Sequence, residues 1–199
     1  MGGGGVPRQI PRQADLVAGG YVGLDMRVVD LRAGNMVDTL PYPPQRIILG
    51  NVPVTIAPPV RPYRGERNMD THGSGHFWAS RDGGERHHLG VDFIAILGDE
   101  VLSPIDGTVK RLGWAYPNDD FGLIEITGRG RHEGVKAQLL YLAPYVRKDQ
   151  TVTAGQVVGH AQDVSKRYAS ITPHVHCEIW IATNPVDMMP RMPPRNVDA

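Results

Sequence analysis

The sequence of 199 residues lacks several features that identify particular classes of protein. It has one cysteine, Cys177, so neither an internal disulfide nor a cysteine-based zinc cluster can form. Basic and acidic residues number 21 each, and a chain without net charge has no electrostatic footprint for nucleic acid or for an anionic membrane. No apolar run approaches the length of a membrane span, and residues 1–20 contain no apolar core of a signal peptide. We therefore expect no nucleic-acid partner, no membrane span and no signal peptide.

Glycine and proline, in contrast, are abundant, with 24 and 17 residues. Both disfavour long helices and favour strands and turns, and no amphipathic run of helical period exceeds a turn or two. We therefore expect a mainly β fold built on an antiparallel sheet. The runs with strand character are Gly90 to Ile96, Gly107 to Leu112, Gly122 to Ile126, Ala137 to Leu142 and His174 to Ile181.

The two ends of the chain differ in composition from its centre. Residues 1–65 contain nine prolines, ten glycines and short β-like runs with too few apolar residues to bury much surface. We interpret them as an extended arm that docks onto protein subunits of a larger assembly; a flexible linker is the alternative, and composition barely separates the two. Residues 66–185 are expected to form one folded domain, and residues 186–199, with three prolines, a C-terminal tail.

A first cluster of polar residues lies on a short strand that is otherwise apolar. Because strand side chains alternate between faces, Val91 and Phe93 share one face and His88 and Asp92 share the other. Gly90 lies between the two polar residues and is expected to leave open space there. The imidazole and the carboxylate can therefore converge on one point.

A second cluster has the same alternation. His174, His176 and Glu178 share one face of a strand, while Cys177 points to the other face and is expected to be a buried apolar residue. Imidazole and carboxylate ligands together suit zinc. Either pattern alone is a weak signal; the two together are more specific. The remaining histidines away from these clusters are expected at the surface or in loops: His72, His76, His132 and His160.

Several segments together resemble the LytM-type zinc metallopeptidases of family M23. The segment from His88 to Phe93 resembles the first metal motif of that family, and Pro173 to Glu178 resembles its terminal P-H-L-H-x-E motif. Between them, Gly98 to Val109 resembles the segment of the family in which a short loop leads to a D-G-x-V turn, and Val152 to Gly159 resembles its V-x-x-G-Q-x-I-G run, in the same order. The resemblance covers roughly residues 70–182.

This resemblance implies a fold of the lysostaphin-like type and one Zn²⁺ per chain, with His88, Asp92 and His176 as ligands. It implies that His174 is a catalytic histidine beside the metal. Three protein ligands leave a fourth position open, which is typical of catalytic rather than structural zinc. The implied substrate is a peptide bond in the cross-links or stems of bacterial peptidoglycan.

One position departs from the family pattern. Tyr141 stands where active members usually carry a further histidine, as in the branch that resembles leukocyte cell-derived chemotaxin 2. With a reference pKa near 10, tyrosine is a poor base at neutral pH, but its hydroxyl can donate a hydrogen bond to a developing oxyanion. Our hypothesis is that Tyr141 acts as such a donor while His174 transfers the proton. The alternative is that Tyr141 only fills space beside the metal.

Three functions are compatible with these observations. The first is a zinc-dependent peptidoglycan endopeptidase carried at the tail tip or baseplate of a virion or a related injection particle, where the arm would dock. The second is a structural or recognition module that binds zinc and cleaves nothing. The third is a bacterial wall-remodelling factor whose signal peptide is missing from this sequence.

Overall fold

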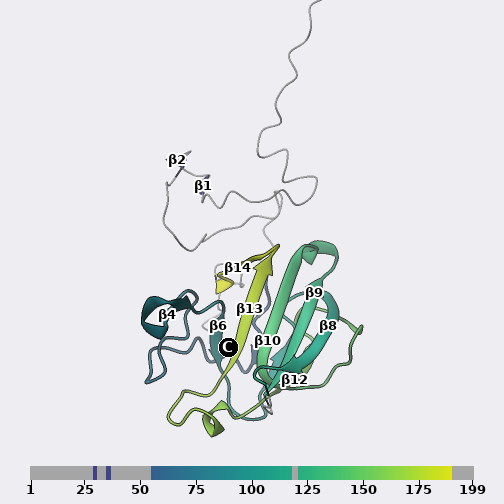
Figure 1. The fold of residues 1–199 in the computed structure, drawn as a ribbon. Helices are drawn as coiled ribbons and strands as arrows, with labels where there is room; N and C mark the ends of the chain where they lie inside the picture. The colour runs from purple at the N-terminus through teal and green to yellow at the C-terminus, as the bar shows by residue number, and fades with distance from the viewer. Residues whose placement is uncertain (1–28, 31–34, 37–54, 118–120, 190–199) are drawn as a thin grey trace, which may run out of the picture.

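The computed structural model describes residues 29–30, 35–36, 55–117 and 121–189 (Figure 1). Most of the predicted arm therefore lies outside the described residues; its described parts are residues 55–65 and the short antiparallel pair β1 (Val29–Asp30) and β2 (Asn35–Met36). None of the helices in the described ranges is long and apolar enough to cross a membrane.

A ten-stranded sheet forms the body of the protein, and every strand pairing in it is antiparallel. Its main path runs β11-β8-β9-β10-β12-β7-β3, and β13 branches from β10 to pair with β14 and β6. The predicted antiparallel β fold is confirmed. The ten strands are β3 (Val60–Arg61), β6 (Val91–Ile94), β7 (Glu100–Leu102), β8 (Gly107–Trp114), β9 (Gly122–Gly128), β10 (Val135–Pro144), β11 (Thr151–Val152), β12 (Val157–Ala161), β13 (His174–Ile181) and β14 (Asn184–Val186).

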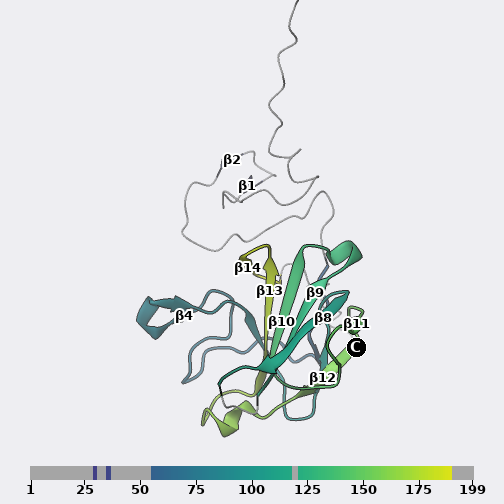
Figure 2. The same cartoon turned by 45° about the vertical axis from the view of Figure 1, so that its right-hand side comes forward.

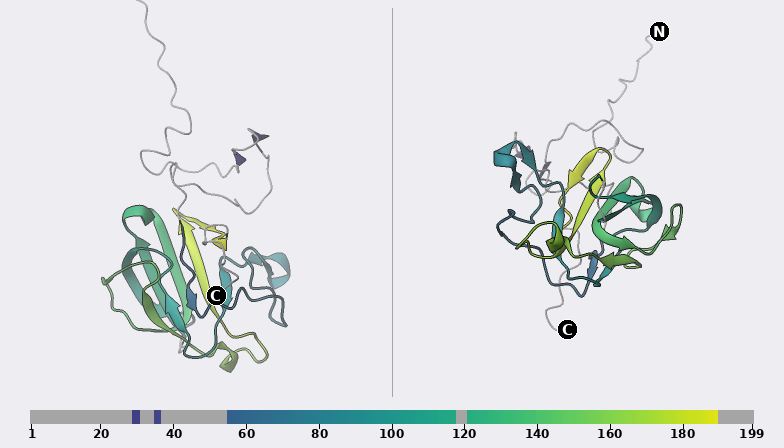
Figure 3. Two further views of the ribbon diagram at one scale, coloured as in Figure 1. Left: turned by 180° about the vertical axis from the view of Figure 1, so that it is seen from behind. Right: turned by 60° about the horizontal axis from the view of Figure 1, so that its bottom comes forward.

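Short elements surround this sheet. A hairpin of β4 (Ser80–Arg81) and β5 (Arg86–His87) forms a separate two-stranded sheet around the 3-10 turn η1 (Asp82–Gly84). The front and rear views place this hairpin on one side of β13 and strands β8 to β10 on the other (Figures 1 and 3). Two further 3-10 turns are η2 (Gly130–His132) and η3 (Val164–Lys166).

The hydrophobic core lies against one face of β10 and β13, which are neighbours in the sheet (Figure 2). Along β10 the buried residues Val135, Ala137 and Leu139 alternate with more exposed ones, as the period of two along a strand requires. Val175 and Cys177 of β13 are fully buried on the same side, so the predicted core position of the cysteine is confirmed. Full burial of an aliphatic side chain stabilises the fold by about 1.5–3 kcal/mol.

Strand β10 changes partners near its end, and this change decides where Tyr141 points. Up to Leu140 the strand pairs with β9 and β13, whereas at Leu142 it still pairs with β9 but β12 has taken the place of β13. The register shifts between these two residues, and Tyr141 has a positive φ of 71°. The bulge interrupts the alternation of faces, so Leu140 and Tyr141 both line the same cavity while Leu142 is buried in the core.

The folded unit extends beyond the predicted limits of residues 66–185. Ile56 and Val60 are buried in the core, and β3 pairs with β7. At the other end, Val186 and Met188 are buried in the same core. These are isolated apolar residues between prolines, so composition averaged over long segments does not detect them.

His132, expected at the surface or in a loop, lies in the turn η2 between β9 and β10 but is fully buried, so the surface alternative is wrong. Its Nε2 donates to the carbonyl oxygen of Thr55 at 3.0 Å, and its Nδ1 accepts from the backbone amide of Asp106 at 3.0 Å. Both partners are distant in sequence, which explains why no local pattern revealed them. His132 thus attaches the segment before β3 to the body of the domain.

Candidate metal centre

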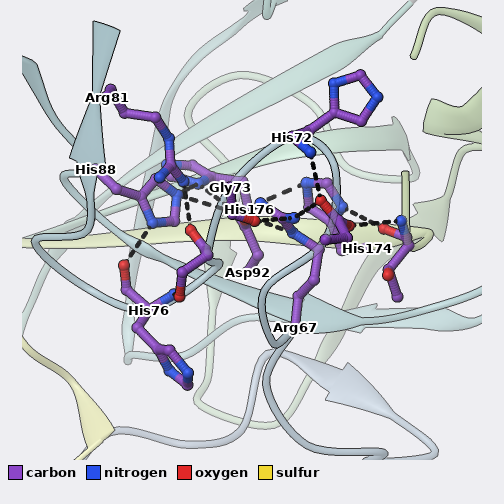
Figure 4. A network of polar contacts seen from close by, with 12 residues as sticks. Arg67, His72, Gly73, His76, Arg81, His88, Asp92, His174 and His176 are labelled. Atoms are coloured by element: carbon purple, nitrogen blue, oxygen red, sulfur yellow. Dashed lines mark hydrogen bonds and ion pairs between the residues drawn. The ribbon is translucent and has the colours of Figure 1, made fainter. Parts of the chain in front are cut away.

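Three side chains of the predicted site meet beside β13. Asp92 of β6 lies directly opposite His176 of β13 in the antiparallel pairing, and His88 precedes β6. The His88 Nε2 atom lies 3.1 Å from Asp92 Oδ1 and 2.9 Å from His176 Nδ1, and the latter two atoms are 2.9 Å apart. All three residues are buried, and Figure 4 shows them pointing toward one another.

The outer ring nitrogens of the two histidines fix their orientation. His88 Nδ1 donates to the carbonyl oxygen of His76 at 2.8 Å, and His176 Nε2 donates to Glu178 Oε1 at 3.0 Å. In the neutral rings the inner nitrogens then carry lone pairs, so two imidazoles and one carboxylate oxygen present three acceptors to one point. Only a cation or a proton can satisfy all three.

This donor set fits a metal ion. A tetrahedral ion with ligands at 2.0–2.1 Å keeps those ligands roughly 3.3 Å apart, close to the separations observed here. The same three residues form a group whose candidate ligand atoms all lie within 4.8 Å of one another. A proton is the competing occupant: burial alone would lower the pKa of His176, but hydrogen bonds to Asp92 and Glu178 raise this pKa to about 9.

Arg67 is a buried component of the site that the sequence did not reveal. Its Nε and Nη2 atoms donate to Asp92 Oδ2 at 3.1 and 2.9 Å, and its Nη1 lies 2.7 Å from Asp70 Oδ1. It thus holds the carboxylate oxygen that faces away from the histidines. Burial alone would raise the pKa of Asp92, but its contacts with His176 and His88 hold this pKa well below its usual range. In the sequence, the only sign of this arrangement is that Arg67 and Asp70 are three residues apart. That spacing does not indicate a contact between Arg67 and Asp92.

His174 lies two residues before His176 on β13 and faces the same centre, as alternation predicted. Its Nδ1 donates to the carbonyl oxygen of Thr172 at 2.7 Å, and its Nε2 is 3.7 Å from Asp92 Oδ1. Burial lowers the pKa of His174, with the charge of Asp92 acting in the opposite direction. The ring is therefore suited to remain neutral with a lone pair on Nε2.

Tyr141 lies beside His174 at the metal centre. Its ring packs edge-on against His174 with centroids 5.3 Å apart, and its hydroxyl lies 2.6 Å from the hydroxyl of Tyr116. Burial raises the pKa of Tyr141 to about 12, although the hydrogen bond from Tyr116 lowers it. Burial also raises the pKa of Tyr116. Both phenols are therefore protonated at neutral pH, and Tyr116 is a second component of the site that sequence patterns did not identify.

A cavity of about 590 Å³ opens above these residues. Part of the lining comes from the β4–β5 hairpin and the segment before it, where the ring of Trp78 stacks on that of His87 with centroids 4.4 Å apart and an interplanar angle of 16°. Tyr116 and Tyr168 also line the cavity. The centre formed by His88, Asp92 and His176 thus lies in a groove whose lining includes several aromatic side chains.

Gly90 differs from its predicted role. A Cβ atom added there would lie 2.4 Å from the carbonyl oxygen of Cys177 and 2.8 Å from Cε1 of His176. The space above Gly90 is therefore occupied by β13 and the His176 ring, and the expectation of open space is wrong. Glycine is required because the two strands approach so closely.

The chain is similar to several known proteins. The sequence model of peptidase family M23 matches residues 86–188. Leukocyte cell-derived chemotaxin-2 of Mus musculus is 28% identical over 121 residues, which are 60% of this chain and 76% of that protein. Myeloid protein 1 of Gallus gallus is 28% identical over 126 residues, 63% of this chain and 38% of that protein.

Among solved structures, Helicobacter pylori Csd3 is similar with a TM-score of 0.50 and 20% sequence identity. The similarity covers 71% of this chain and 34% of Csd3, so the chain spans about a third of that protein. At this identity the similarity concerns the fold.

Proposed function

The chain belongs to peptidase family M23, and from that premise we propose that it is a zinc-dependent endopeptidase that cleaves peptide bonds of bacterial peptidoglycan. The observation that carries the proposal is the convergence of His88 Nε2, Asp92 Oδ1 and His176 Nδ1 in an open cavity. These three side chains would hold one Zn²⁺, and Arg67 and Glu178 would orient the ligands.

The chain supplies two further groups for hydrolysis. A zinc ion held by three protein ligands provides Lewis-acid polarisation and lowers the pKa of water. His174 Nε2, neutral and turned toward the centre, accepts the proton of the attacking water and delivers it to the amine of the leaving peptide. The carbonyl oxygen of Thr172 fixes the ring by accepting from its Nδ1.

Tyr141 acts in this proposal as a hydrogen-bond donor. Its pKa of about 12 excludes it as a base at neutral pH. When Tyr116 donates to the oxygen of Tyr141, the Tyr141 proton remains available for the carbonyl oxygen of the scissile bond. A donor of this kind stabilises the negative charge that develops on that oxygen.

A second candidate function is a zinc-binding recognition module that cleaves nothing. The favouring observation is the same tyrosine, because its hydroxyl already has a partner in Tyr116 and a histidine base is missing at this position. In that case the groove would bind wall peptides without hydrolysing them.

Metal analysis and wall digestion test these two functions together. The purified protein is expected to contain about one zinc per chain and to release muropeptides from purified sacculi. His174→Ala should abolish release while zinc remains bound, and the exposed His160→Ala serves as the matched control with unchanged release. Zinc-loaded protein that leaves sacculi intact would support the recognition module, and protein that binds no zinc would contradict both functions.

We also propose that the protein is carried in a phage tail, a baseplate or a related particle. The support is the composition of residues 1–65, which suits docking onto other subunits. Mass spectrometry of density-gradient fractions should find the protein with intact particles. Its recovery only from cell-envelope fractions would contradict particle carriage and leave the peptidase proposal intact.

A further inference from the structure

Arg81 of β4 presents a guanidinium group to the wall of the cavity. Its Nη2 donates to the carbonyl oxygen of Ser74 at 2.6 Å, and its Nη1 donates to the carbonyl oxygen of Ser80 at 3.2 Å. A guanidinium has five N–H donors, so these two bonds fix the group and leave three donors for another partner.

The other arginines of the cavity wall are already neutralised. Arg67 pairs with Asp70 and Asp92, and Arg86 pairs with Asp82 at 2.7 Å. Arg81 donates only to backbone carbonyls, and within the described ranges no carboxylate lies at ion-pair distance from it. The wall thus contains one cation whose charge has no acidic partner in the described part of the chain.

This cation lies close to the metal centre. Gly73 lies between Arg81 and Arg67: a Cβ atom added to Gly73 would lie 3.3 Å from Arg81 Nη1, and its carbonyl oxygen accepts from Arg67 Nη1 at 2.7 Å. Arg67 in turn binds Asp92 of the metal centre. Figure 4 shows the Arg81 side chain reaching toward the group formed by His88, Asp92 and their neighbours. Arg81 and the three metal-binding candidates line the same cavity.

The surroundings of Arg81 disfavour an uncompensated positive charge. Burial lowers its pKa, and Arg67 and Arg86 act in the same direction, while Asp92 opposes them. The side chain nevertheless remains charged, because guanidinium groups do not lose their proton in proteins. An anion placed against Arg81 would therefore interact with a cation that is partly desolvated and held in one orientation, and that has no acidic partner among the described residues.

We propose that Arg81 is a specificity residue that binds a carboxylate of the substrate beside the scissile bond. This inference rests on the proposed peptidase function and adds the chemistry of the substrate: a peptide with a free carboxylate near the bond to be cut. The planar fork of guanidinium N–H groups matches the two oxygens of a carboxylate. The carboxylate is either the terminus of a stem peptide or an acidic side chain within it.

Equilibrium binding of defined muropeptides tests the proposal without depending on turnover. Three synthetic forms are used: the free acid, a form amidated at the chain terminus, and a form amidated on the acidic side chain. They are titrated by calorimetry into the zinc-loaded full chain carrying His174→Ala. Amidation of one of the two carboxylates is expected to weaken binding on the order of tenfold to a hundredfold relative to the free acid. The form that binds more weakly identifies the carboxylate that Arg81 binds.

The variants separate recognition from a merely structural role. Arg81→Gln should remove the preference for the free acid, and Arg81→Lys, which keeps the charge without the fork, should retain part of it. Arg86→Gln is the matched control on the same hairpin and should keep the full preference, because Arg86 is already paired with Asp82. A change in the melting temperature of Arg81→Gln with equal loss of binding for all three forms would show a structural role and overturn the proposal.

The outcome also distinguishes this inference from the proposed function. Equal affinity for all three forms in the protein with Arg81 intact would overturn the role of Arg81 alone. Failure to bind any of them would contradict the peptidoglycan substrate, and with it the recognition of a carboxylate on that substrate.

Discussion

Single residues around Asp92 determine whether this centre can hold a metal. One carboxylate oxygen faces two imidazole nitrogens, and the other is held by Arg67. This division prevents the carboxylate from rotating and leaves a defined acceptor for an ion. A small set of buried polar contacts thus decides both the stability and the chemistry of the site.

Replacement of Arg67 tests whether this arginine holds the second carboxylate oxygen of Asp92. Arg67→Gln removes the partner of two carboxylates, Asp70 and the buried Asp92, and should destabilise the fold by about 3–5 kcal/mol. Urea denaturation followed by tryptophan fluorescence measures the change. The control Arg61→Gln, in an exposed pair with Glu100, should have little effect. Equal stability of the two variants would show that Arg67 does not hold Asp92.

Tyr141 allows a second test at the residue scale. If its hydroxyl donates to the substrate oxygen, Tyr141→Phe should lower kcat by roughly a hundredfold or more with unchanged zinc content. Tyr141→His should also lower kcat, because an imidazole would replace the phenol hydroxyl that donates to the substrate oxygen. The exposed Tyr145→Phe is the control. An increase in kcat for Tyr141→His would instead indicate a degraded base position.

At the scale of elements, the site depends on the close approach of β6 and β13. Their pairing places Asp92 opposite His176, and Gly90 permits the contact at the start of this pair. The bulge in β10 then turns Tyr141 onto the same face. The metal-binding face is therefore assembled from strand register rather than from a single local motif.

Gly90→Ala should separate these strands. The added methyl group would meet the Cys177 carbonyl and the His176 ring, and such overpacking typically costs about 1–3 kcal/mol. Zinc affinity should fall with stability. Gly113→Ala in β8 is the matched control, since nothing lies within 4 Å of its added Cβ. Thermal unfolding and zinc titration of both variants measure these effects, and equal behaviour would contradict the close approach.

Asp70 links the segment before the hairpin to the loop before β13, and this link should depend on pH. Burial alone would raise the pKa of Asp70, but amide hydrogen bonds from Thr172 and His72 and the pairing with Arg67 lower it from 3.8 to about 2. A depressed folded-state pKa contributes stability above about pH 4, which is lost as the pH falls toward 2. Asp70→Asn should flatten the stability profile between these values in acid titrations. If stability depended on pH in the variant as steeply as in the wild type, Asp70 would be excluded as the cause of that dependence.

For the whole molecule, metal binding and folding should be linked. Ligands from β6, β13 and the segment before β6 come together only in the folded chain, so an ion that binds there stabilises the native state. At zinc concentrations a thousand times the Kd the gain is roughly 4 kcal/mol, which raises Tm by about 10 °C. Chelation should reverse this shift in scanning calorimetry. Asp92→Asn should show no zinc-dependent shift; a shift of wild-type size would place the ion elsewhere.

The sequence alone determined the β class, the two polar faces and the buried position of Cys177. These follow from the period of two along a strand, which is a local property of the backbone. It also contained the ordered motifs of family M23, which indicated His88, Asp92, His174 and His176 before any geometry was known.

The tertiary structure decided the features that depend on contacts between distant segments. Arg67 reaches Asp92 from 25 positions earlier in the chain, and the carbonyl of Thr55 accepts from the ring of the buried His132 77 positions later. The direction of Tyr141 follows from a change of strand partners, and the requirement for Gly90 follows from the proximity of another strand. Periodicity cannot reveal such features, because it describes which face a residue takes and not which segment lies opposite.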